Sequence, residues 1–548
     1  MLELKRLASK RLGIRAAVLL AAVAAGTLAG CSGSASSGSS VSPGGSASPA
    51  SPGTAAASAA SDAGAKPVLT MGITNYTSTL NPAIAGGGDE AMPIDLAYQS
   101  LTHQEPNGDI GPGLATSWHY IGNTNTEFSL TLRPNARFSD GTPVTASAVK
   151  AWLDYAYFTV KGYITSSVAL KSISTSGNYT VVLHLAQPNS LMPYLLSEAD
   201  MWGYIGSPKA IAHASTLGTG TDGAGMYVAV PSQSVAGSTY VFKPNPYYYN
   251  QSAVRFSEVV AKVITSPTTM VEAIRSGQLN VAQGDITTES TAQSAGLNVI
   301  TAPSGFDQIL LLDRGPMTPD GAPNPLNSVQ VRQALNYAIN RQAVTQAIYG
   351  KYGVPTDETG SLDGLVPSLQ NYYAYNPAKA KSLLAAAGYP NGFTFTVDSE
   401  SAFGTLADPV LEAIAQEYKA IGVTLKITTS PVLPTWVNQV LGGSYEACGF
   451  IATAFAPISD WYSGQLAPNS SENQHGWDDP TLDQLDKEGE ASQSPGQYWK
   501  AMTQRIVTQG DEIPVFNFDA FWYTAKNIGG VDFSADNGTP YPSEWYAK

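Results

Sequence analysis

This 548-residue sequence has two cysteines and five histidines, the side chains that most often bind transition metals. No two histidines lie three or four residues apart, and none has a cysteine nearby: His103, His119, His184, His213 and His475. Zinc sites use closely spaced Cys and His ligands, so we expect no metal site. No stretch resembles the nucleophile elbow of a hydrolase. Because catalytic triads assemble in space, a surface-tethered hydrolase stays an alternative.

A glycine-rich stretch, Gly218-Thr-Gly-Thr-Asp-Gly223, has the glycine spacing of a dinucleotide-binding loop. Such a loop must lead into a helix whose N-terminus holds the phosphates. The residues that follow, 226–230, have the composition of a strand instead. We therefore expect no nucleotide and no other cofactor.

Cys31 stands where covalent modification is expected. Residues 1–15 carry five basic side chains, and residues 16–28 are almost wholly Ala, Val and Leu, which is the pattern of a signal peptide. The sequence Leu28-Ala29-Gly30-Cys31 resembles the bacterial lipobox. This motif predicts that residues 1–30 are removed and that Cys31 is lipidated, for example with palmitate.

Residues 31–65 are expected to be a disordered tether behind the lipid. From Ser32 to Ala65 the chain is almost only Ser, Gly, Ala and Pro, which cannot bury enough apolar surface to fold. No later apolar run is long enough to cross a bilayer. The lipid on Cys31 is therefore the only membrane attachment that the sequence predicts.

The composition favours neutral polar recognition over charge recognition. The net charge is −14, which argues against nucleic acid or anionic lipid as a partner. Charged residues make up 13% of the chain, whereas it has 28 Tyr and 9 Trp. Hydroxyls, amides and aromatic faces are thus the main groups available for binding.

Strand and helix signals alternate after Lys66, which predicts an α/β fold in more than one domain. Residues 128–132 and 180–185 have strand patterns, and Thr145 is placed to cap a helix. A second helix should begin at Asn376-Pro377 and end before Gly388.

Two further patterns indicate core positions. Val331, Leu335, Ala338 and Ile339 share one helical face. Cys448 lies in an apolar run that predicts a buried strand with an inert thiol.

Several motifs, in order, resemble family 5 of the extracellular solute-binding proteins, which are the receptors of oligopeptide, dipeptide and nickel ABC importers. The similarity runs from about Leu69 to Trp545. The motifs are Pro112-Gly-Leu-Ala115, Phe138-Ser-Asp-Gly-Thr-Pro143, Gly223-Ala-Gly-Met-Tyr227, Asn245-Pro-Tyr-Tyr248, Ser328 to Leu335 with Ala338-Ile-Asn-Arg341, and Asn376 to Phe393. Most of these residues, including Arg332 and Arg341, are expected to be structural.

The resemblance implies a two-lobed clamp of the periplasmic-binding-protein type II class, with a subdomain inserted in the first lobe. The implied limits are 66–100, 223–313 and 528–548 for lobe I, 101–222 for the insertion, and 314–527 for lobe II. The chain would cross between lobes near Arg314 and Lys526.

The resemblance places the ligand between the lobes, where three regions are candidates. They are the glycine loop with Asp89, the segment with Gln283 and Asp285, and the stretch from Phe455 to Tyr462 with Asp460 and Trp461. For any one of these residues, a plain loop or core role is an equally open interpretation.

The third region departs from the family pattern. Peptide-binding members carry an acidic residue there that pairs with the α-ammonium group of the ligand, but Pro457 stands near that position. Either Asp460 supplies the carboxylate from a shifted loop, or the ligand has no free amine.

The implied function is that of a monomeric, lipid-anchored receptor on the outer face of the cell membrane. It would capture peptides between hinged lobes and deliver them to an ABC permease and its ATPase subunits, without catalysis. An oligosaccharide or other polar solute as ligand, and a sensor or adhesin role without a permease, remain open.

Overall fold

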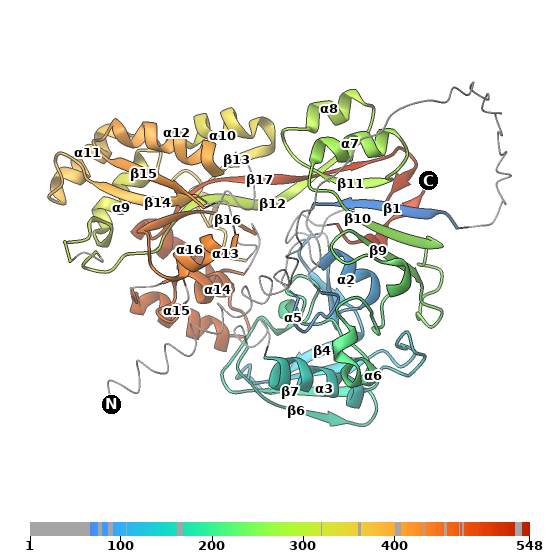
Figure 1. Cartoon of the computed structure of the whole chain (residues 1–548). Helices are drawn as coiled ribbons and strands as arrows, with labels where there is room; N and C mark the ends of the chain where they lie inside the picture. The colour runs from blue at the N-terminus through green and yellow to red at the C-terminus, as the bar shows by residue number, and fades with distance from the viewer. Residues whose placement is uncertain are drawn as a thin grey trace, which may run out of the picture.

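The computed structural model has two lobes side by side, with a smaller subdomain beneath the first lobe (Figure 1). It describes residues 66–74, 79–85, 91–105, 107–161, 168–318, 321–359, 363–399, 407–430, 433–453, 457–470, 472–473, 476–531 and 540–548. The predicted signal peptide and tether, with Cys31, lie outside these residues, as do Asp89 and Phe455. Within this part of the chain, every helix is too short or too polar to span a bilayer.

One mixed sheet runs through both lobes, and its two longest strands, β12 (Asn298–Leu311) and β17 (Ile513–Thr524), lie at its centre. The other strands are β1 (Val68–Ile73), β8 (Tyr227–Ala229), β9 (Thr239–Pro244), β10 (Glu258–Val263), β11 (Val281–Gly284), β13 (Gly353–Pro355), β14 (Thr394–Ser399), β15 (Thr424–Thr429) and β16 (Ala447–Thr453). Their order is β15-β14-β16-β12-β17-β11-β1-β10-β9-β8, and β13 also pairs with β17. Because β12 pairs with β16 and β17 pairs with β11, these two strands connect the lobes and form the hinge.

The first lobe is built around β1, which pairs in parallel with β10 and β11. Leu69, Met71 and Ile73 alternate along β1 and pack with the helix α2 (Ala91–Ala97). On the opposite face of the sheet lie α7 (Pro267–Arg275) and α8 (Glu289–Ser294) (Figure 1). The helix α7 begins where Ser266 Oγ accepts a hydrogen bond from Thr269 N at 3.3 Å, with proline at the first helical position.

The inserted subdomain has its own four-stranded antiparallel sheet and its own apolar core. The strands are β4 (Ala115–Tyr120), β5 (Glu127–Leu132), β6 (Leu170–Ser176) and β7 (Thr180–Leu185), in the order β4-β5-β7-β6. The helix α3 (Ala146–Asp154) packs on this sheet, and Thr145 caps it as predicted. The small elements are β2 (Thr102–Gln104), β3 (Ile110–Pro112), α5 (Met192–Leu195) and α6 (Pro208–Ala212).

The second lobe surrounds β14, β15 and β16 with helices. These are α9 (Val329–Tyr337), α10 (Arg341–Ile348), α11 (Pro377–Ala386), α12 (Ala407–Lys419), α13 (Leu433–Leu441), α14 (Ile458–Trp461), α15 (Pro480–Ala491) and α16 (Gly496–Gln509). The predicted start of α11 is confirmed, since Asn376 Oδ1 accepts from Lys379 N at 2.9 Å. After the helix, Gly388 takes a φ of +93°, which favours glycine. A short pair, β18 (Ile528–Gly529) and β19 (Tyr546–Ala547), lies near the C-terminus in the first lobe.

The core positions predicted from the sequence are confirmed. Cys448 is completely buried in β16. Arg332 and Arg341 are buried structural residues: Arg332 Nη2 lies 2.9 Å from Asp511 Oδ1, and Arg341 Nη1 lies 2.9 Å from Asp357 Oδ1. Arg341 Nε also donates to the Pro514 carbonyl at 2.7 Å, so both arginines hold together segments of the second lobe that are far apart in sequence.

The largest apolar core extends across the expected limit between the lobes. It contains Met270 of the segment expected in lobe I and Leu335 of the segment expected in lobe II. The shared strands β12 and β17 carry the chain between the lobes. The limits near Arg314 and Lys526, and the three-part division built on them, remain a proposal.

Candidate functional site

Each lobe has a pair of parallel strands that end near the hinge. The carboxyl ends of the pair in one lobe face those of the pair in the other lobe. The strand β17 runs from the second lobe to the first, and β11 is antiparallel to it, so β11 and its neighbour β1 end toward the second lobe. The strand β16 is antiparallel to β12, so β16 and its parallel neighbour β14 end toward the first lobe. Ligands of open α/β sheets bind outside the carboxyl ends of the strands. The candidate site is therefore the space between the lobes.

The structure brings the predicted ligand residues to these facing strand ends in two groups. Gln283 is in β11 and Asp285 follows it directly, in the first lobe. Asp460, Trp461 and Tyr462 follow β16 in the second lobe. Whether these residues contact a ligand remains a prediction.

In the first lobe, Gln283 and Asp285 shape the strand ends. Gln283 Oε1 accepts hydrogen bonds from Thr74 N at 3.1 Å and Thr74 Oγ1 at 2.6 Å. Asp285 Oδ1 accepts from Thr288 N at 2.9 Å and Thr288 Oγ1 at 2.7 Å, which forms the turn into α8. Tyr523 donates to the Asp285 carbonyl at 2.7 Å. These contacts tie Thr74, at the end of β1, to β11 and hold the turn that follows β11.

In the second lobe, Trp461 and Tyr462 anchor the short helix α14 in the core. Trp461 Nε1 donates to Glu512 Oε1 at 2.8 Å, and its ring packs edge-on against Phe306. Tyr462 donates to Asp483 Oδ1 at 2.6 Å. Both side chains are buried, so they hold α14 in a fixed orientation.

Asp460 lies on the opposite side of α14 from the buried side chains. At about 100° per residue, the helix turns Asp460 away from Ile458, Trp461 and Tyr462, which pack in the core. Its side chain is half-buried, and among the described residues its carboxylate has no hydrogen-bond or ion-pair partner. Burial raises the pKa of Asp460 to about 6. A desolvated carboxylate for which the described residues supply no ion-pair partner favours a cationic ligand group.

Two π-helices, which sequence reasoning missed, continue α3 and α14. In the insertion, η2 (Tyr155–Val160) continues α3, and Asn81 Nδ2, from the segment after β1, donates to Tyr155 Oη at 3.3 Å. In the second lobe, η8 (Tyr462–Leu466) continues α14. Such turns are frequent at functional sites. No local sequence signal predicts them.

Reasoning from the sequence also did not identify two acidic residues beside α14, Asp486 and Glu490. Ser459 Oγ lies 2.6 Å from Asp486 Oδ1 and 2.5 Å from Glu490 Oε1, both on α15. Burial raises the pKa of Asp486 to about 6 and that of Glu490 to about 7. A hydroxyl has one proton to donate, so full ionisation of both carboxylates would leave one of them facing an oxygen lone pair.

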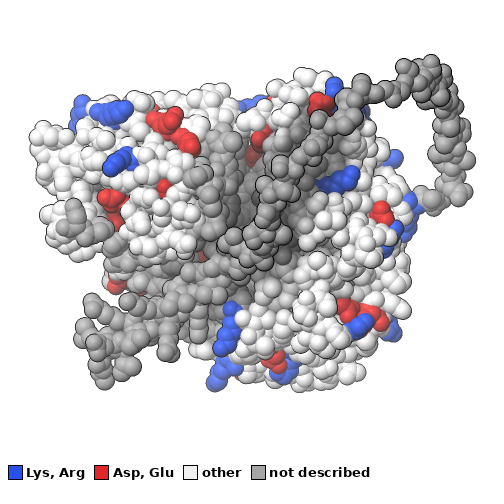
Figure 2. Space-filling view, in the orientation of Figure 1, with Lys and Arg blue, Asp and Glu red and all other residues white. Residues whose placement is uncertain are grey.

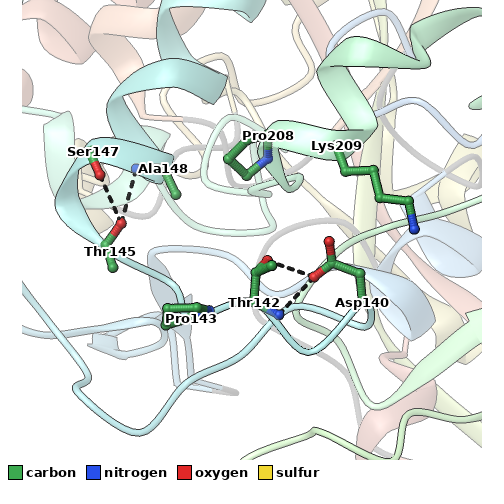
Figure 3. Close-up of a pocket in the computed structure, with 8 residues that line it drawn as sticks. All are labelled: Asp140, Thr142, Pro143, Thr145, Ser147, Ala148, Pro208 and Lys209. Atoms are coloured by element: carbon green, nitrogen blue, oxygen red, sulfur yellow. Dashed lines mark hydrogen bonds between the residues drawn. The ribbon is translucent and has the colours of Figure 1, made fainter.

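Beyond these strand ends, the described surface shows scattered charges and one hollow. Acidic and basic side chains of the described residues are interspersed over the face in Figure 2, without a large area of one sign. A hollow of about 300 Å³ lies between the turn before α3 and the start of α6 (Figure 3). Two of its polar side chains serve local structure: Asp140 Oδ1 accepts from Thr142 N at 2.8 Å, and Thr145 Oγ1 accepts from Ala148 N at 3.3 Å. The described residues hold no cluster of three potential metal ligands.

The comparison with protein families agrees with this architecture. The family model described as "Bacterial extracellular solute-binding proteins, family 5 Middle" matches residues 109–474, more than half of the chain. The chain belongs to family 5 of the bacterial extracellular solute-binding proteins. The resemblance predicted from the sequence motifs is thereby confirmed.

Relatives within family 5 include glutathione-binding proteins. The glutathione-binding protein GsiB of Salmonella typhimurium (strain LT2) is 28% identical over 376 residues, which cover 66% of this chain and 69% of that protein. GsiB of Escherichia coli (strain K12) is 26% identical over 374 residues, with coverages of 66% and 69%.

Solved structures confirm the predicted fold, the two-lobed type II clamp. A dipeptide-binding protein of Pseudoalteromonas sp. SM9913, solved with Met-Leu, superimposes with a TM-score of 0.71 at 20% identity, over 88% of this chain and 100% of that one. The ABC transporter substrate-binding protein CtaP of Listeria monocytogenes gives a TM-score of 0.74 at 17% identity, with the same coverages.

Proposed function

We propose that this family 5 protein is the receptor of an ABC importer and captures short peptides with a free α-amine between its lobes. The observation that carries the proposal is the half-buried carboxylate of Asp460, which lies at the strand ends that face the first lobe and has no hydrogen-bond or ion-pair partner among the described residues. A peptide ammonium would supply the missing cation. The glutathione-binding relatives support this ligand class, since glutathione is a tripeptide with a free amine.

The proposed mechanism is ligand-driven closure about β12 and β17. A peptide that contacts both lobes binds the closed form more tightly than the open form and so shifts the population toward closure. The closed monomer then docks on a membrane permease coupled to ATPase subunits. The protein itself performs no chemistry on the peptide.

Calorimetry with the purified full-length chain tests the ligand class. Di- to pentapeptides and glutathione should bind, whereas the same peptides with an acetylated N-terminus should bind at least tenfold more weakly, because they lack the charge that pairs with Asp460. Tight binding of an oligosaccharide with no response to any peptide would contradict the proposal.

Mass spectrometry of the recovered peptide should find it intact. Cleavage would instead favour the hydrolase alternative.

We further propose that Cys31 carries the lipid that keeps this receptor at the outer face of the cell membrane, with residues 32–65 as its tether. Cys31→Ser is expected to release the protein into the medium, because several acyl chains on one cysteine anchor stably and none would remain. Fractionation followed by calorimetry measures both properties. The released variant should bind solute with the parent affinity, and retention at the membrane would refute the anchor.

A further inference from the structure

Loops of the inserted subdomain reach across to the second lobe. Asn125, between β4 and β5, donates from Nδ2 to the carbonyls of Glu490 and Ser492, both at 2.8 Å. Gln493 Nε2 donates in return to Asn125 Oδ1. Asn125 is completely buried, so both ends of its amide are used in this contact with the end of α15 and the loop after it.

A second loop of the insertion contacts the same place. Ser190 N donates to Glu490 Oε2 at 2.6 Å, while the other oxygen of this carboxylate accepts from Ser459 of the second lobe. Asn189 N donates to the Asn125 carbonyl at 3.0 Å, which ties the two loops together. The contact therefore acts as one unit, with the Glu490 carboxylate at its centre.

Local structure prepares both partners for this contact. Asn125 has a φ of 50°, in the left-handed region that asparagine adopts more readily than most residues. On the other side, Gly489 lets the end of α15 lie directly against α16, because a Cβ there would be 2.3 Å from the Trp499 ring. The carbonyl groups of Glu490 and Ser492 are thus already held in position when the loops of the insertion come into contact with them.

The contact is polar and separable. The apolar core of the insertion contains no residue of the second lobe among the described residues, and the core around α14 and α16 contains none of the insertion. Breaking the contact therefore exposes little apolar surface. Its free energy comes from hydrogen bonds, which can form and break as the lobes move.

We propose that Asn125, Ser190 and Glu490 form a latch that holds the lobes closed on the side opposite the hinge. In Figure 1 the hinge strands β12 and β17 lie at the upper side, whereas α15 and the insertion lie at the lower side. The latch fixes the separation of the closed lobes and so positions both walls around the solute. Solute cannot leave while the latch is formed.

The proposed latch depends on the proposed function in one respect, which is the position of the solute between the lobes. Closure of the empty protein is a property of the chain alone, so it can be measured without any solute. The latch and the peptide assignment can therefore fail separately.

Spin-label distances in the full-length, solute-free chain test the latch. Ser176→Cys on the insertion and Lys381→Cys on the second lobe give exposed label sites; every variant also carries Cys31→Ser, and Cys448 is buried. Asn125→Gly keeps the backbone conformation and removes the amide, and Glu490→Ala removes the carboxylate. Each should lower the ratio of closed to open molecules about tenfold.

Glu488→Ala is the matched control, since it removes an exposed carboxylate from the same helix. It should leave the distance distribution unchanged.

In the latch variants any bound solute should also dissociate about tenfold faster, because release requires opening. Unchanged distances in both Asn125→Gly and Glu490→Ala, with native thermal unfolding, would overturn the latch. Failure of peptides to bind would overturn the proposed function and leave the distance result standing.

Discussion

Replacing Asp460 with Asn is expected to weaken the binding of peptides with a free amine by about tenfold to a hundredfold. The substitution keeps the size of the side chain and removes the charge that would pair with the ligand ammonium. Hydrogen bonds between charged groups contribute about 1.5–3 kcal/mol, which corresponds to this range of affinity. Because α14 is anchored through Trp461 and Tyr462, the helix should keep its position. Calorimetry at pH 7.5 measures the change.

The affinity of the parent protein should also depend on pH. The pKa of Asp460 is raised to about 6 in the free protein, and a bound ammonium would lower it. Binding should therefore release a proton near pH 6, and the affinity should fall about tenfold per pH unit below that value while staying level above about pH 7. Asp460→Asn should abolish this dependence, whereas Glu488→Gln should retain it. If Asp460→Asn binds as the parent does at every pH, Asp460 is not the counter-ion.

Replacing Arg332 with Met should destabilise the protein by about 3–5 kcal/mol, because it leaves Asp511 as a buried charge without its partner. Arg332 and Asp511 are 3% and 0% exposed, and the distance between Nη2 and Oδ1 is 2.9 Å. Burial raises the pKa of Asp511, and the nearby arginines Arg332 and Arg314 oppose that rise. Without Arg332 the pKa should rise further, so the loss of stability should shrink as the pH falls. Urea denaturation at several pH values measures both effects.

A double substitution distinguishes a lost charge partner from a general loss of packing. Arg332→Met combined with Asp511→Leu removes both charges and should recover a large part of the stability. Arg275→Met is the control for an exposed pair, since Arg275 and Glu272 are 63% and 51% exposed. It should change the stability by less than about 1 kcal/mol. A loss as small as this for Arg332→Met would contradict the assigned role.

The parts of the fold that were predictable from the sequence depend on short-range signals. Thr145 and Asn376 cap helices because their side chains reach backbone amides three residues away. Gly388 ends its helix through a positive φ. The strand at 180–185 agrees residue for residue, because its apolar side chains alternate within one sheet. The overall clamp followed from family motifs and not from periodicity.

The details of the site could not be predicted because they depend on contacts distant in sequence. Asn125 is 365 residues from Glu490, and nothing local marks it as a contact between the lobes. Asp460 was identified from its place in the family pattern, but its direction follows from the way α14 packs. The bulges in the pairing of β12 with β17, between Pro303 and Gly305 and between Asp307 and Gln308, likewise have no sequence signature.

The shared strands also determine how the molecule unfolds. Each lobe obtains part of its central sheet from β12 and β17, so neither lobe can lose its sheet while the other keeps both strands intact. The apolar core that contains both Met270 and Leu335 adds to this dependence. The insertion has a separate sheet and core, and is the part able to open by itself. The two lobes are thus expected to unfold together, whereas the insertion can open separately.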